Sequence, residues 1–201
     1  MADYSVNQGA SKTITRDLRY QSYTGAVLGD WANLTVASGT VFALEADEKT
    51  EGEVDSATAS TVVDATFDEA DDFWNGTTLE FTSGDNEGEK REVSDFVSTG
   101  GMFTLNVLGN PLPATPAAGD DFVLLGYPII PRTDLDGHDH GAISTQRVTF
   151  QITPADGGSS TNGVTATPGR KLLILALTWS DAGGNTDGDE FRYAIDVRPS
   201  T

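Results

Sequence analysis

The chain has 201 residues, of which 31 are acidic, 12 are basic and none is cysteine, so its formal net charge is −19. This charge argues against binding to nucleic acid phosphates or to an anionic membrane surface, and it suits solubility at high salt. The lack of cysteine excludes disulfides, thiolate metal sites and cysteine nucleophiles. No apolar run is long enough to span a bilayer, and the polar N-terminal segment lacks the apolar core of a secretion signal. We therefore expect synthesis in a cytoplasm and no membrane association.

Short segments rich in Thr and β-branched residues, separated by turn signals, predict an all-β protein. The segments "RVTFQIT" and "FRYAIDV" alternate between apolar and polar residues, as half-buried strands do. The acidic segment Glu45–Ser60 is expected to be either a mobile loop or a helical turn. The expected strands are Lys12–Leu18, Thr40–Leu44, Thr61–Ala65, Thr78–Phe81, Arg91–Val97, Met102–Leu105, Phe122–Leu125, Gln146–Ile152, Leu172–Trp179 and Phe191–Val197.

The pattern of strands and loops divides the chain into four parts, built as small β-sandwich or barrel-like modules. Two prolines and a polar Gly/Asp cluster mark residues 127–142 as a linker loop. Residues 1–60 are expected to form an N-terminal β region for anchoring and oligomerisation, and residues 61–126 a middle β module. Residues 143–201 are expected to form a C-terminal immunoglobulin-like sandwich. This last part is short for such a domain, so it is expected to borrow strands from elsewhere in the chain.

The middle module opens with an apolar pair, Phe73-Trp74, followed by Asn75-Gly76. Asn and Gly tolerate positive φ, so this segment predicts a tight turn, and Trp74 is expected to close the module's core. The segment Ser83–Gly88 predicts a second turn between two strands. No residue of the module is placed like a nucleophile beside its base, so we expect a structural role for it and not chemistry.

Part of the sequence resembles a small β module that recurs in virion proteins of tailed bacteriophages and related archaeal viruses. The shared pattern is D-x-F-W-N-G-x-x-L-x-F-x-S-G-x-N-x-G-x-x-R-x-V, followed by P-A-x-P-A-A-G-D-x-F. The match covers about a third of the chain. In this sequence the pattern consists of Asp72, Phe73, Trp74, Asn75, Gly76, Leu79, Phe81, Ser83, Gly84, Asn86, Gly88, Arg91, Val93, Pro113, Ala114, Pro116, Ala117, Ala118, Gly119, Asp120 and Phe122.

The resemblance implies a non-enzymatic structural protein of a virion, made in the host cytoplasm. The role expected first is that of a capsid decoration or cement protein on the head exterior, bound as a homotrimer to the major capsid protein or to another virion protein. A tail, baseplate or head–tail accessory protein is the first alternative. A carbohydrate-binding adhesin is the second, because Tyr4, Tyr20, Tyr23, Trp31 and Trp74 could form a sugar-stacking platform unless they fill β cores.

An enzymatic role finds little support in the sequence. Both histidines lie in one loop and no G-x-S-x-G elbow is present, which argues against a Ser-His-Asp hydrolase. The loop "DLDGHDHG" is the candidate metal site. Its Asp oxygens around a Gly turn could bind calcium, its H-x-H pair could bind a transition metal, or it is a plain solvated loop. No cofactor other than such a metal ion is expected. The candidate ligands are Asp134, Asp136, His138, Asp139 and His140.

The N-terminal region carries the candidate interface. The segment Arg19–Trp31 is too apolar for a free loop, and its aromatic residues are of the types enriched at protein interfaces. Two of the few basic residues lie in the same region and could pair bidentately with acidic groups of a partner. The candidate interface residues are Tyr4, Arg16, Arg19, Tyr20, Tyr23 and Trp31.

Overall fold

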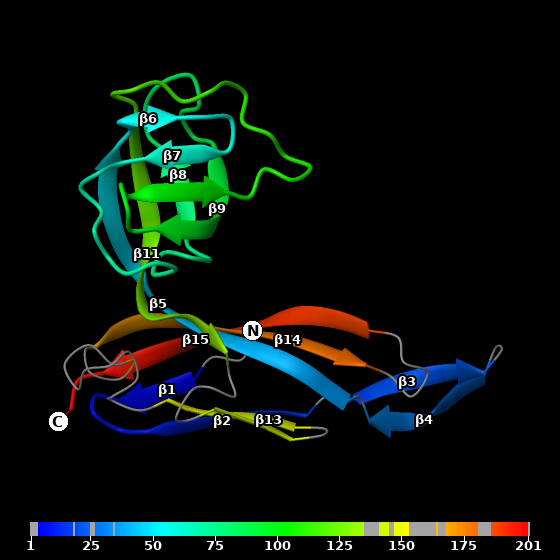
Figure 1. Cartoon of the computed structure of the whole chain (residues 1–201). Helices are drawn as coiled ribbons and strands as arrows, with labels where there is room; N and C mark the ends of the chain where they lie inside the picture. The colour runs from blue at the N-terminus through cyan, green and yellow to red at the C-terminus, as the bar shows by residue number, and fades with distance from the viewer. Residues whose placement is uncertain are drawn as a thin grey trace. The chain divides into compact units, whose positions relative to one another are not determined.

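The computed structural model describes residues 4–17, 19–24, 27–33, 35–134, 141–144, 147–152, 164, 168–180 and 186–200. Within these ranges every regular element is a β-strand, which confirms the prediction of an all-β fold (Figure 1). The described part of the chain contains no helix with the length and apolarity needed to cross a membrane.

Most strands join one mixed sheet, with the strand order β1-β15-β14-β5-β11-β8-β9-β10-β7-β6. Separate sheets have the orders β12-β13-β2 and β3-β4. The bounds are β1 Tyr4–Asn7, β2 Lys12–Asp17, β3 Arg19–Thr24, β4 Val27–Asn33, β5 Thr35–Glu53, β6 Ser56–Ala57, β7 Thr61–Val63, β8 Thr78–Phe81, β9 Lys90–Val97, β10 Met102–Leu105, β11 Asp121–Asp134, β12 Gly141–Ser144, β13 Arg147–Ile152, β14 Gly169–Ser180 and β15 Thr186–Arg198.

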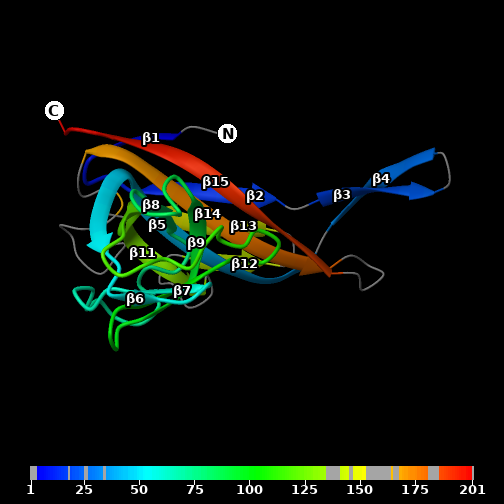
Figure 2. The ribbon, with the colours of Figure 1, turned by 90° about the horizontal axis from the view of Figure 1, so that it is seen from above.

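The chain forms two compact units that differ from the expected four-part division. One, the terminal unit, combines Met1–Ala43 with Thr133–Thr201, and the other, the inserted unit, consists of Leu44–Arg132. The N-terminal and C-terminal regions belong together because β1 pairs in parallel with β15 and β2 pairs with β13 (Figure 2). The expected linker at 127–142 begins inside strand β11, and residues 44–60 belong with the middle module.

The segment expected to be a mobile loop or a helical turn is neither. Residues Glu45–Glu53 form the second half of β5, and Ser56–Ala57 form β6. In the sheet, β5 lies between β14 and β11, so backbone hydrogen bonds hold an acidic sequence of low strand propensity in an extended conformation. The charged side chains of Asp47, Glu48 and Lys49 remain exposed.

The inserted unit has an aromatic core that the sequence partly predicts. Trp74 is 0% exposed, which confirms that it closes the core, and its indole Nε1 donates a 3.0 Å hydrogen bond to Glu69 Oε2. The ring centroid of Phe103 lies 5.0 Å from that of Phe67 and 4.9 Å from that of Phe96. Edge-to-face and tilted packing of this kind contributes stability beyond the buried area alone.

The predicted turns of the inserted unit are also present. Gly76 has a φ of 87°, and its N–H donates a 2.7 Å hydrogen bond to the carbonyl of Val93. Gly84 and Gly88 have φ values of 77° and 83° at the second turn. These left-handed conformations are the reason that glycine occupies the positions.

The terminal unit is built around β14, which is buried on both faces at Leu173, Ile174 and Leu175. On β15, Tyr193, Ile195 and Val197 are buried, as their alternation predicts, although Ala194 between them is buried too.

The two units differ strongly in charge. The inserted unit contains 19 acidic and 4 basic residues, and the terminal unit contains 12 acidic and 8 basic residues, which gives formal charges of −15 and −4. Most of the chain's negative charge therefore belongs to the inserted unit, and most of its basic side chains belong to the terminal unit.

Candidate functional site

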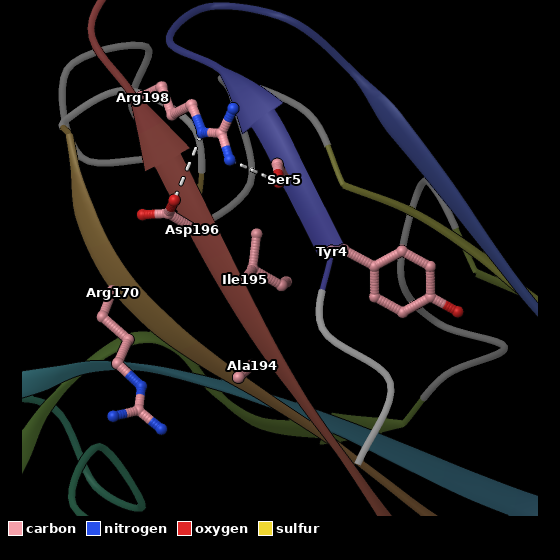
Figure 3. A pocket seen from close by; sticks show the side chains of 7 residues that line it. All are labelled: Tyr4, Ser5, Arg170, Ala194, Ile195, Asp196 and Arg198. Carbon is pink, nitrogen blue, oxygen red and sulfur yellow. Dashed lines mark hydrogen bonds and ion pairs between the residues drawn. The ribbon is translucent and has the colours of Figure 1, made fainter.

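The terminal unit has a pocket of about 350 Å³ over strands β1, β14 and β15, which we call the arginine pocket (Figure 3). Its described lining combines two arginines with a tyrosine, a serine, one acid, an alanine and an isoleucine. The lining residues are Tyr4, Ser5, Arg170, Ala194, Ile195, Asp196 and Arg198.

The strand register brings these residues together from distant parts of the sequence. Ser5 of β1 and Arg170 of β14 are both partners of Asp196, which lies between them on β15. Residues that are paired across a sheet share a face, so the three side chains form one row. Ala194 and Arg198 are two positions from Asp196 along β15, so they extend the same face along the strand.

Arg198 is held by two contacts that leave most of its hydrogen-bonding capacity unused. Its Nε donates to Asp196 Oδ2 at 3.3 Å, and its Nη2 donates to Ser5 Oγ at 3.1 Å (Figure 3). The side chain is 62% exposed, so the ion pair with Asp196 is solvated and contributes little to stability. A guanidinium has five N–H donors, so Arg198 can bind a further acceptor while it keeps both contacts.

Tyr4 lies beside the pocket on β1, where it is the register partner of Ile195, so its ring belongs to the opposite face of the sheet from Ser5. The Nζ atom of Lys12 lies 5.5 Å from the centroid of the Tyr4 ring, and the ring of Tyr193 lies 5.7 Å from it, centroid to centroid. Asp196 is the one acid among the seven lining residues. Among the described lining residues, Arg170 and Arg198 therefore supply two positive charges against one negative charge, on a chain whose net charge is −19.

The arginine pocket is suited to binding and not to acid–base catalysis. The hydroxyl of Ser5 accepts a hydrogen bond from Arg198, and a guanidinium does not deprotonate to act as a general base. Among the lining residues that the structure describes there is no histidine. The arrangement can neutralise and orient an anionic group, which is the chemistry that paired arginines perform best.

A second hollow of about 580 Å³ lies over β5, β14 and β15. Among its described lining residues the charged one is Glu190, which forms a 3.1 Å ion pair with Arg192. The hydroxyls of Ser38 and Thr178 bond to each other at 2.6 Å, so this hollow offers less unsatisfied polar capacity than the arginine pocket. Its lining consists of Ser38, Gly39, Thr40, Ala176, Leu177, Thr178, Gly188 and Glu190.

Among the candidate interface residues whose side chains the structure describes, Tyr4 lines the arginine pocket. Arg16 lies in β2, where its backbone pairs with Val148, and the other four lie in the hairpin formed by β3 and β4. In that hairpin the register pairs Tyr20 with Ala32 and Tyr23 with Leu28. Among the described strands, β3 and β4 pair only with each other, and both views show them side by side (Figures 1 and 2).

The candidate metal loop lies almost wholly outside the described residues. Asp134 is the last residue of β11, and Asp136, His138, Asp139 and His140 are not described. Across the described ranges, no group of three or more His, Asp or Glu side chains is arranged to hold a metal ion. The metal site remains a prediction.

The two arginines that define the pocket could not be recognised as site residues from the sequence. Arg170 precedes an apolar strand and Arg198 ends an alternating one, so each reads alone as an ordinary exposed position. Only the parallel pairing of β1 with β15 places them beside Tyr4. A comparison of the chain with models of known protein families and with curated proteins found no match.

Proposed function

We propose that this protein is a non-enzymatic structural component of a virion, which decorates or cements the exterior of a capsid head. It binds the major capsid protein or another virion protein in many copies and acts as a homotrimer. The observation that carries the proposal is the β3–β4 hairpin, whose strands pair only with each other among the described strands. The resemblance of the inserted unit's sequence to a virion module supports the same role.

The hairpin argues for assembly because an isolated two-stranded ribbon is at best marginally stable in water. Its sequence contains Arg19, Tyr20, Tyr23 and Trp31. Arg, Tyr and Trp are enriched among the interface residues that contribute most of the binding free energy. A partner that covers the ribbon would supply the burial that two strands lack. The hairpin is therefore the anchoring element in this proposal.

The charge distribution supports different roles for the two units. The inserted unit, with a formal charge of −15, is poorly suited to close contact with a protein surface and well suited to face solvent. The terminal unit has a formal charge of only −4 and contains the hairpin and the arginine pocket. In this proposal the terminal unit binds the particle and the inserted unit keeps the decorated particle soluble.

The test is a measurement of copy number. Intact particles from the source of this protein are purified, and the amount of this chain relative to the major capsid protein is measured by quantitative mass spectrometry. Hundreds of copies per particle are expected for a decoration protein. A few to tens of copies would move the protein to the tail, the baseplate or the head–tail junction, and its absence from particles would overturn the proposal.

The adhesin alternative loses one of its proposed residues. Trp74 is fully buried, so it cannot stack against a sugar. The platform would then depend on Tyr4 and on the hairpin. Specific binding of the intact protein to immobilised glycans, together with absence from the head exterior, would favour this alternative.

A further inference from the structure

We propose that the arginine pocket binds carboxylate groups of an acidic segment on a partner protein, which extends the proposed function by naming the chemistry of the partner at this site. The pocket lies in the terminal unit, the part of the chain assigned to particle binding. Three features support the proposal: the unused donors of Arg198, the uncompensated charge of Arg170, and the size and composition of the pocket.

Arg198 is already oriented for a ligand. Asp196 and Ser5 hold its guanidinium at one edge of the pocket through bonds of 3.3 Å and 3.1 Å. The Nη1 group makes neither of these bonds, and Nη2 makes only one. A pre-oriented guanidinium loses less conformational entropy on binding than a free one, which makes it an effective carboxylate receptor.

Arg170 supplies the charge that the pocket leaves uncompensated. It is the register partner of Asp196, but that carboxylate bonds to Arg198. None of the contacts between described residues involves the guanidinium of Arg170, which Figure 3 shows pointing away from Asp196 and Arg198. Its N–H donors at the edge of the pocket are therefore open to an acceptor on a ligand.

The pocket's size and composition identify the ligand class. A volume of about 350 Å³ suits one or two acidic side chains, and Ala194 gives their methylene groups an apolar contact. Each guanidinium can bind one carboxylate with two parallel hydrogen bonds, so Arg170 and Arg198 suit a segment with more than one acidic side chain. The net charge of −19 repels an extended polyanion such as nucleic acid, whereas a short acidic segment presents its charge only at the pocket.

The sheet also leaves the pocket open on one side. Strand β1 is the last in the order of the large sheet among the described strands, so no further described strand lies beyond Tyr4 and Ser5. An extended segment of a partner can therefore approach along this edge.

The proposal is tested with a defined probe, a tetraglutamate peptide that is acetylated and amidated at its ends. Its binding to the intact protein is measured at low ionic strength by isothermal titration calorimetry. The test variant carries Arg170→Gln and Arg198→Gln. The control is Arg192→Gln, because Arg192 lies on the same strand as Arg198, is 56% exposed and is paired with Glu190 away from the pocket. All three arginines are exposed, so thermal melts are expected to show that both variants fold normally.

Saturable binding by the wild type and by the Arg192→Gln variant is expected, with at least about a tenfold loss in the double variant and a loss of affinity at high salt. No saturable binding by the wild type, or equal binding by the double variant, overturns the proposal. Binding of inorganic phosphate or glucuronic acid in place of the peptide also overturns it, and assigns the pocket to a free anion or an acidic sugar. The proposed function is judged separately: a double variant that loses the peptide but still occurs on particles leaves the virion role intact and places its anchor elsewhere.

Discussion

The Nε atom of Arg91 donates a 2.8 Å hydrogen bond to the main-chain carbonyl of Asn110, 19 residues further along the chain. The same guanidinium donates to the carbonyls of Pro111 and Lys90 and to Glu89 Oε2, at 2.8, 2.6 and 2.9 Å. The side chain is only 3% exposed. One buried arginine therefore fixes the proline-rich segment that leads into β11 against strand β9.

Replacement of Arg91 by Met is expected to lower the free energy of unfolding by about 3 kcal/mol. The change removes the donors of several main-chain carbonyls, and a buried carbonyl left without a donor costs about 1–3 kcal/mol. Urea unfolding of the two proteins measures the difference. Lys90→Met is the control, because Lys90 is 53% exposed and its ion pair with Glu80 is expected to contribute about 1 kcal/mol or less. Equal stability of the Arg91 and Lys90 variants would show that the guanidinium does not hold the segment.

Substitution of two adjacent glycines can distinguish the cost of backbone strain from the cost of a steric collision. Gly100 and Gly101 both have positive φ, at 84° and 61°, but a Cβ on Gly101 would collide with the carbonyl oxygen of Asp64, and one on Gly100 would meet nothing within 4 Å. Gly100→Ala is expected to cost about 1 kcal/mol from the left-handed conformation alone. Gly101→Ala is expected to cost about 3 kcal/mol or more, because the backbone of Asp64 has to move. Thermal or urea unfolding of the pair checks this order, and the reverse order would contradict the contact.

Salt is expected to raise the melting temperature of the protein. The formal charge of −15 on the inserted unit opposes its compact state, and salt screens that repulsion. Most of the gain is expected between 0.1 M and 1 M sodium chloride, where the Debye length falls from about 10 Å to about 3 Å. Differential scanning calorimetry at several salt concentrations measures the shift. A melting temperature that does not change with salt would mean that this charge is already balanced by other contacts.

Removal of the β3–β4 hairpin is expected to convert the proposed trimer to a monomer while both units stay folded. Residues 19–33 are replaced by a short Gly-Ser linker, and the mass is measured by sedimentation equilibrium. Leu108→Asp is the control, because Leu108 is 93% exposed in the inserted unit and reports on nonspecific apolar association. A trimer that survives removal of the hairpin would exclude it as the assembly element, as would a wild-type protein that is monomeric.

The sequence predicted best those strands whose signal is local. Thr78–Phe81 and Met102–Leu105 match the structure at both ends, because each alternates cleanly and is bounded by turn residues. The second half of β5 was missed since its acidic residues carry no strand signal, and its pairing partners hold it extended. Strand β1 was missed because it is short and pairs with residues at the opposite end of the chain.

The candidate site was less accessible to sequence reasoning than the fold. Tyr4 was predicted at an interface from its residue type and its place near the N-terminus. Arg170 and Arg198 can be recognised as residues of one site only from the strand register, which aligns Ser5, Asp196 and Arg170 across three strands. No local pattern encodes a parallel pairing between the first and last strands of a chain, so the pocket could not be predicted.

The chain enters the inserted unit through β5 and leaves it through β11, and these two strands are neighbours in the sheet. Because the chain enters and leaves Leu44–Arg132 at adjacent strands, this unit is exchangeable. A different folded module with neighbouring ends could replace it without new connections in the terminal unit. The terminal unit could thus keep the attachment role that we propose for it while evolution, or an engineer, changes the inserted unit. A fluorescent or antigenic domain grafted between Ala43 and Thr133 would exploit the same joint.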